Sequence, residues 1–155
     1  MKILAIDPGN EKSACVIWNT ETQIIEDKNI ISNEDIINKI IILDSYPDID
    51  IIVIEMVASY GMPVGKEIFE TVLWIGRFYQ YFSNYDIPVK LLYRKDIKLH
   101  LCNSMKAKDG NIRQALIDRF GKVGTKKNQG KLYGVSKDLW SALAIAVTYE
   151  DVYLK

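Results

Sequence analysis

Near its start the chain reads Ile3-Leu4-Ala5-Ile6-Asp7-Pro8-Gly9, an apolar run that ends in an acid and two turn-forming residues. Four consecutive apolar residues predict a buried strand, and Pro8-Gly9 predicts a turn directly after it. Asp7 falls at the junction, where burial would strip water from its carboxylate unless a partner compensates the charge. An Asp before Pro-Gly also forms turns, so Asp7 alone leaves a purely structural role open.

Two further acids occupy comparable positions. Glu55 ends the apolar run at residues 51–54, and Asp138 precedes the apolar segment at residues 139–147. Several converging carboxylates usually bind a divalent cation, and hard oxygen ligands suit Mg²⁺ or Mn²⁺ better than zinc. Asp7, Glu55 and Asp138 together therefore predict a metal site.

Size and composition predict one globular domain over residues 1–155. The chain has a mass of 17.8 kDa and is 48% hydrophobic, enough for one core and too little for two. The sequence shows no apolar run of the roughly 18 residues that a membrane span needs, and its start lacks a signal-peptide layout. Cys15 and Cys102 fit neither a disulfide framework nor a zinc cluster. We expect a soluble, unprocessed, cytoplasmic protein without a membrane partner.

Charge is distributed unevenly along the chain. The formal net charge is zero, yet residues 90–137 hold 13 Lys or Arg against 3 acids. Such a cationic half favours a polyanionic partner, nucleic acid first among candidates. Solvated helix faces are the alternative explanation.

Hydrophobic periodicity and turn residues predict an alternating order of strands and helices. Ser32 is the expected N-cap of the first helix, whose apolar residues are 36, 37, 40, 41 and 43 and which Pro47 ends. Strands are expected at residues 2–7, 14–18, 23–30, 50–55 and 88–93, later helices at 66–82, 95–102, 108–120 and 136–150, and a mobile basic loop at 121–134.

This order, with acids on the first strand, the fourth strand and the last helix, resembles the ribonuclease H-like superfamily. Within it, the chain is most similar to RuvC-type Holliday junction resolvases, particularly the short versions of phages and prophages. The resemblance implies an α/β fold whose mixed five-stranded sheet, three antiparallel strands then two parallel ones, is flanked by helices. It is carried by residues 3–9, Ile54-Glu55, Lys98, Ala107-Lys108, and Asp138 followed by Ala142-Leu143-Ala144-Ile145-Ala146.

The resemblance also implies an activity, that of a crossover junction endodeoxyribonuclease acting in a bacterium or a phage-infected cell. Its chemistry is phosphodiester hydrolysis with two Mg²⁺ ions roughly 4 Å apart, for which Mn²⁺ is expected to substitute. Asp7 would bridge both ions, while Glu55 and Asp138 would each complete one coordination shell. Lys98 and Lys108 match positions near the scissile phosphate, although both also suit ordinary surface lysines.

One position departs from the family pattern. A fourth carboxylate is usual one helical turn after Asp138, and Ser141 stands there. Three acids plus water could suffice, Glu70 could act as a supplementary acid, or cleavage could have been lost. Glu70 and Glu67 also suit exposed helix positions, and Asp109 suits a helix N-terminus.

The remaining basic residues are expected to contact DNA phosphates, which position a duplex without reading its sequence. Tyr60 is a candidate for stacking on a base in an opened junction, with loop anchoring as the alternative. The expected phosphate contacts are Arg94, Lys95, Lys106, Arg113, Lys126, Lys127 and Lys131.

The resemblance implies a C2 homodimer that nicks two strands symmetrically and needs no small-molecule cofactor. Phe69, Leu73, Trp74, Phe78 and Phe82 give the helix at 66–82 more apolar surface than one face needs, so part of it is expected at the dimer contact. Three alternatives remain: a nuclease for other branched DNA or RNA, an inactive junction-binding dimer, and an actin-like ATPase or sugar kinase, for which 155 residues leave no room.

Overall fold

A single five-stranded sheet organises the computed structural model, which describes residues 1–38 and 47–155. The strand order is β3-β2-β1-β4-β5, with antiparallel pairing among the first three strands and parallel pairing from β1 to β4 and β5. The predicted fold class is therefore confirmed. The strands are β1 (Lys2–Asp7), β2 (Lys12–Asn19), β3 (Ile24–Ser32), β4 (Ile51–Met56) and β5 (Val89–Tyr93).

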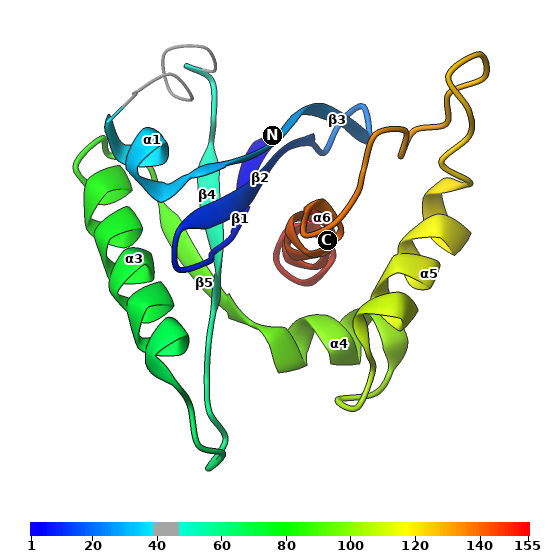
Figure 1. Ribbon diagram of the computed structural model, residues 1–155. Helices are drawn as coiled ribbons and strands as arrows, with labels where there is room; N and C mark the ends of the chain where they lie inside the picture. The colour runs from blue at the N-terminus through cyan, green and yellow to red at the C-terminus, as the bar shows by residue number, and fades with distance from the viewer. Residues whose placement is uncertain (39–46) are drawn as a thin grey trace.

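Helices cover both faces of the sheet (Figure 1). One face carries α1 (Asn33–Asn38) and α3 (Lys66–Ser83), and the other carries α4 (Arg94–Cys102), α5 (Asp109–Phe120) and α6 (Leu139–Tyr149). The π-helix η1 (Glu150–Leu154) continues α6 to the end of the chain. None of the helices in the described part of the chain is long and apolar enough to cross a membrane.

The central strand β1 is buried on both faces. Ile3 and Ala5 belong to the core beneath α6, while Leu4 and Ile6 belong to the core beneath α3. A strand covered on both sides has no need for alternating polar residues, which explains the continuous apolar run. The same holds for β4.

Most predicted elements lie within two or three residues of their observed bounds, and the first helix is capped as expected. The backbone N–H of Asp35 donates a 3.1 Å hydrogen bond to Ser32 Oγ, and Ile36 packs in the core. The predicted continuation of this helix through residues 40, 41 and 43 lies outside the described residues.

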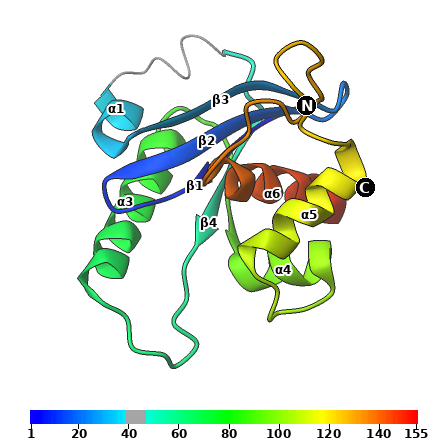
Figure 2. The ribbon, with the colours of Figure 1, turned by 45° about the vertical axis from the view of Figure 1, so that its right-hand side comes forward.

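The basic loop at 121–134 has a defined backbone path. Its central part is a small hairpin in which Gly130 N–H donates to the Val123 carbonyl at 3.0 Å, and Leu132 anchors it in the core. In two views this loop, coloured yellow to orange, lies at the opposite end of the molecule from the loop at 57–65 that follows β4 (Figure 2).

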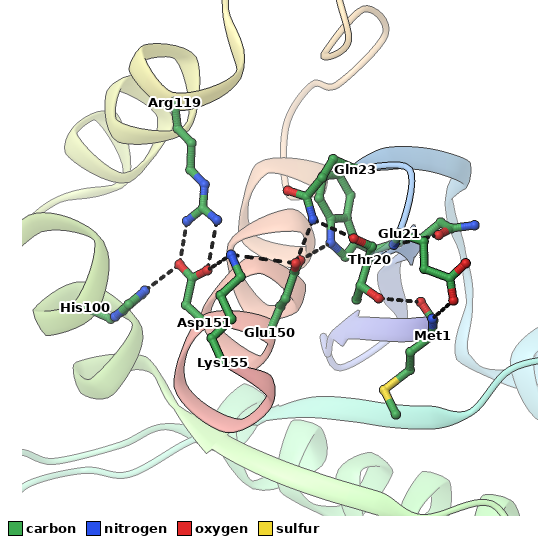
Figure 3. Close-up of polar contacts among 11 residues, drawn as sticks. Met1, Thr20, Glu21, Gln23, His100, Arg119, Glu150, Asp151 and Lys155 are labelled. Carbon is green, nitrogen blue, oxygen red and sulfur yellow. Dashed lines mark hydrogen bonds and ion pairs between the residues drawn. The ribbon is translucent and has the colours of Figure 1, made fainter.

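The C-terminal end is held by polar contacts to three other elements (Figure 3). Glu150 accepts hydrogen bonds from Trp18 in β2 and from Gln23. Asp151 pairs with Arg119 of α5 and with His100, which is exposed on α4. These contacts fix the far end of α6 against both the sheet and its neighbouring helices.

Candidate active site

Asp7 and Glu55 leave neighbouring strands at the same end of the sheet. In the parallel pair β1 and β4, Ile6 lies opposite Ile54, so the next residue of each strand is an acid. Glu55 is 7% exposed and Asp7 is half-buried. The parallel register thus brings two carboxylates, 48 positions apart in the sequence numbering, to one edge.

Asp138 joins them electrostatically from the start of α6. Burial, and then the negative charges of Glu55 and Asp138, together raise the pKa of Asp7 to about 8 against the opposing effect of Arg94. The three predicted acids therefore share one electronegative site.

Arg94 contacts Glu55 directly, which the sequence did not predict. Its Nη1 lies 3.3 Å from Glu55 Oε2, and its Nη2 forms an ion pair with Asp109. Burial raises the pKa of Glu55, and the positive charges of Arg94 and, to a smaller extent, Lys98 reduce this increase. The guanidinium of Arg94 thus lies between Glu55 and Asp109, and its expected contact with DNA phosphate stays a prediction.

The residues at this edge fit a divalent cation in their chemistry. Asp7, Glu55 and Asp138 offer only hard oxygen ligands, and Asp7 accepts no hydrogen bond from any other described residue. In the arrangement seen, however, no three His, Cys, Asp or Glu side chains within residues 1–38 and 47–155 are close enough together to hold one ion. An ion held by all three acids at once would therefore require side-chain movement.

A buried hydrogen-bond network fixes the turn behind Asp7. Ser13 Oγ donates to Asn33 Oδ1 at 2.6 Å, and Asn33 Nδ2 donates to the Gly9 carbonyl at 2.8 Å. Gly9 N–H in turn donates to Ser13 Oγ at 3.2 Å. These contacts join the turn after β1 to the start of α1, and no sequence pattern predicts them.

A largely apolar cavity of about 380 Å³ opens beside Glu55 and includes Arg94 and Lys98 in its lining. Tyr60, an exposed residue with a positive φ of 49°, also lines it. The Lys95 ammonium lies 5.5 Å from the centre of the Tyr60 ring. The structure thus brings four of the predicted DNA-contact or catalytic residues to the acidic edge.

A second cavity, of about 330 Å³, lies beside Asp138 and includes Ser141, Asp109 and Arg113 in its lining. The Arg113 guanidinium also lies 5.1 Å from the ring centre of Trp140. Arg113 and Ser141 are therefore neighbours of the third acid.

Other predicted residues lie outside this group. Lys108 is the N-cap of α5 and lines neither cavity. Glu70, the possible supplementary acid, accepts a hydrogen bond from Asn10 Nδ2 at 3.3 Å and pairs with Lys66 at 3.5 Å. Lys106 in the turn after α4, and Lys126, Lys127 and Lys131 in the loop at 121–134, are exposed.

Comparison with solved structures identifies similar folds. Thermus thermophilus RuvC is 14% identical with a TM-score of 0.70, covering 96% of this chain and 93% of that one. T. thermophilus RuvC in complex with a Holliday junction substrate is 14% identical with a TM-score of 0.69, covering 96% and 92%. The yeast mitochondrial Holliday junction resolvase Ydc2 is 11% identical with a TM-score of 0.62, covering 95% and 78%.

No protein-family model and no curated protein matches the sequence. At identities of 11–14%, the structural likeness shows the fold. The chain has the RuvC type of ribonuclease H-like fold.

Proposed function

We propose that this protein is a structure-selective endonuclease that resolves four-way DNA junctions by metal-dependent phosphodiester hydrolysis. The observation that carries the proposal is the shared electrostatic site of Asp7, Glu55 and Asp138 at one edge of a RuvC-type fold. One solved example of that fold is bound to a Holliday junction substrate. The protein would act as a single domain in the cytoplasm of a bacterium or a phage-infected cell.

The three acids would hold Mg²⁺, or Mn²⁺ in its place, with two ions per site and Asp7 between them. Two such ions promote deprotonation of the attacking water and stabilise the leaving 3′ oxygen. Lys98 already acts on Glu55 through its charge, so it is positioned to offset negative charge at the scissile phosphate. Lys108 would approach the same phosphate from the start of α5.

DNA contact would extend across the molecule. Tyr60, Lys95 and Arg113 line the two cavities at the acidic edge, where Tyr60 is exposed enough to stack on an unpaired base. Lys106 is exposed in the turn between α4 and α5. The loop at 121–134 lies at the opposite end from the loop at 57–65, so its lysines Lys126, Lys127 and Lys131 would contact a junction arm.

A homodimer would place two such sites on opposed strands of one junction. The exposed face of α3 supports this part of the proposal, because Phe69 and Leu73 are each 65% exposed. Large apolar side chains gathered on one helix face are typical of protein contacts. Phe78 and Phe82 of the same helix are buried in the core, so only its exposed part would form the dimer contact.

The test is cleavage of a labelled four-way junction, compared with a matched linear duplex, a single strand and an RNA junction, in Mg²⁺ or Mn²⁺. The wild type should nick the DNA junction symmetrically, and Asp7→Asn should abolish nicking without weakening junction binding. Asp86→Asn, which removes an exposed acid elsewhere, is the matched control and should cleave normally. Comparable cleavage of the linear duplex or the single strand would overturn the junction preference, and comparable cleavage of the RNA junction would overturn the preference for DNA.

Ser141 favours one alternative, a junction-binding protein without cleavage activity. Ser141 lines the cavity beside Asp138 at the position where the family usually has an acid. Binding without nicking in either metal would support this alternative. Cleavage gained by Ser141→Asp would then identify the missing carboxylate as the cause.

A further inference from the structure

Arg94 is placed beside Glu55 by the sheet itself. Glu55 lies opposite Leu92 in the parallel pair β4 and β5, and Arg94 begins α4 directly after β5 ends at Tyr93. The guanidinium therefore reaches Glu55 across one strand spacing. Its two terminal nitrogens divide between two acids, Nη1 toward Glu55 and Nη2 toward Asp109.

The two acids that Arg94 contacts differ sharply in exposure. The side chain of Glu55 is 9% exposed and that of Asp109 is 82% exposed. A buried carboxylate without a cation is costly, whereas an exposed one is solvated by water. Arg94 is therefore needed at Glu55 when no other cation is present, and its contact with Asp109 is optional.

A divalent ion and Arg94 would compete for Glu55. An ion bound at about 2.1 Å from a Glu55 oxygen would lie within a few ångströms of the guanidinium and repel it. A divalent ion carries twice the charge of the guanidinium and would displace Arg94 from Glu55.

We propose that Arg94 is a tethered counter-ion that neutralises Glu55 in the metal-free protein, and that Asp109 receives the guanidinium when a divalent cation displaces it. Arg94 is a positioning residue on this account, since it acts through Glu55. The proposal rests on the metal site of the proposed function and does not depend on the identity of the nucleic-acid substrate.

The test is calorimetric titration of the full-length protein with Mn²⁺, without DNA. Arg94→Gln should bind Mn²⁺ about tenfold more tightly than the wild type, because it removes a positive charge that repels the ion. Arg94→Lys should return the affinity toward the wild-type value, because a cation again competes for Glu55. Arg77→Gln, which removes an exposed arginine paired with Glu34, should bind as the wild type does.

A double-mutant cycle tests the role of Asp109. Asp109→Asn should weaken Mn²⁺ binding, because displaced Arg94 has lost its acceptor, and should have no effect when Arg94 is already Gln. If Asp109→Asn weakens binding equally in both backgrounds, Asp109 acts on the metal directly and the proposed transfer is wrong.

Thermal unfolding separates competition from misfolding. Arg94→Gln should melt below the wild type in EDTA and recover most of the difference in saturating Mn²⁺. Unchanged or weaker Mn²⁺ binding by Arg94→Gln, with the wild type binding normally, would overturn the counter-ion role and leave the nuclease proposal standing. No Mn²⁺ binding by the wild type would remove both, while Mn²⁺ binding without junction cleavage would remove only the nuclease.

Discussion

Trp18 and Glu150 are 132 residues apart in the chain, and the Trp18 indole Nε1 donates a 2.6 Å hydrogen bond to Glu150 Oε2 inside the protein. Both side chains are almost completely buried. Gln23 Nε2 donates to the other oxygen of Glu150, also at 2.6 Å. Because Glu150 directly follows α6, this bond fixes the helix whose opposite end begins next to Asp138.

Trp18→Phe should therefore lower the free energy of unfolding by about 1 to 3 kcal/mol, because it leaves a buried carboxylate short of one donor. Urea unfolding at neutral pH measures the effect. Trp74→Phe is the matched control, since Trp74 is only half-buried against Phe78 and should cost less. Equal losses in the two variants would mean that the indole matters only as apolar volume.

Asp151 should make stability depend on pH in the acid range. Hydrogen bonds from Arg119 and then His100 hold its pKa well below the ordinary value of 3.8. The stabilisation is therefore present above pH 3.8 and is lost as the pH falls through the lower folded value. Asp151→Asn should destabilise the protein at neutral pH and approach the wild type in strong acid.

Urea unfolding of wild type and Asp151→Asn across this range gives the difference directly. Asp118→Asn, an exposed acid on α5, serves as control and should track the wild type throughout. A constant gap between wild type and Asp151→Asn at every pH would contradict an ionic origin.

Asp7 should produce the opposite dependence in the metal-free protein. Burial, then Glu55 and Asp138, raise its pKa from 3.8 to about 8, so the folded state keeps a proton that the unfolded chain has released. Stability in EDTA should consequently fall as the pH rises from about 4 to about 8. Asp7→Asn should flatten this decline and melt above the wild type in alkali. If the melting temperatures of the wild type and Asp7→Asn in EDTA fall in parallel as the pH rises, other groups cause the decline.

Gly9 is required by the close approach of the chain to itself. A Cβ at this position would lie 2.3 Å from the Lys12 carbonyl oxygen, so the turn after Asp7 would have to shift. Gly9→Ala should cost about 1 to 3 kcal/mol of stability and reduce junction cleavage. Gly76→Ala in α3 meets no atom within 4 Å and should stabilise by up to about 1 kcal/mol. A neutral Gly9→Ala in both urea unfolding and cleavage would show that the turn can relax.

Leu73→Glu should produce a monomer if the exposed face of α3 forms the dimer contact. A buried unpaired carboxylate at an interface is unfavourable, while in a monomer the same side chain would be solvated. Light scattering at micromolar concentration gives the mass. Leu99→Glu, at an exposed leucine of α4, is the control and should leave the mass unchanged. A wild-type protein that is already monomeric would remove the dimer from the proposed function.

The positions of Asp7 and Glu55 were predictable because each directly follows an apolar run on a strand that is covered on both faces. Once two such strands are parallel neighbours, their terminal acids must meet. The strand pattern therefore predicted both the fold class and the proximity of Asp7 and Glu55.

The contacts of Arg94 and Glu150 were not predictable in this way. Arg94 lies 39 residues from Glu55, and their pairing depends on the order of β4 and β5 and on a side-chain rotamer. Glu150 ends an apolar helix, where an acid is ordinarily solvated, and only the packing of β2 against that helix makes it a buried acceptor. Neither contact produces a pattern of apolar and polar residues from which it could be predicted.

The strand order divides the acidic edge into parts of unequal rigidity. Asp7 ends β1, which has a hydrogen-bonded neighbour on each side, whereas Arg94 follows β5, which among the described residues pairs with β4 alone. Edge strands fray at lower free energy than central ones. The backbone at Asp7 is thus among the last parts of the sheet to open, while Arg94 is attached to its edge strand. Transient opening of β5 would therefore move Arg94 away from the site and leave Asp7 in place.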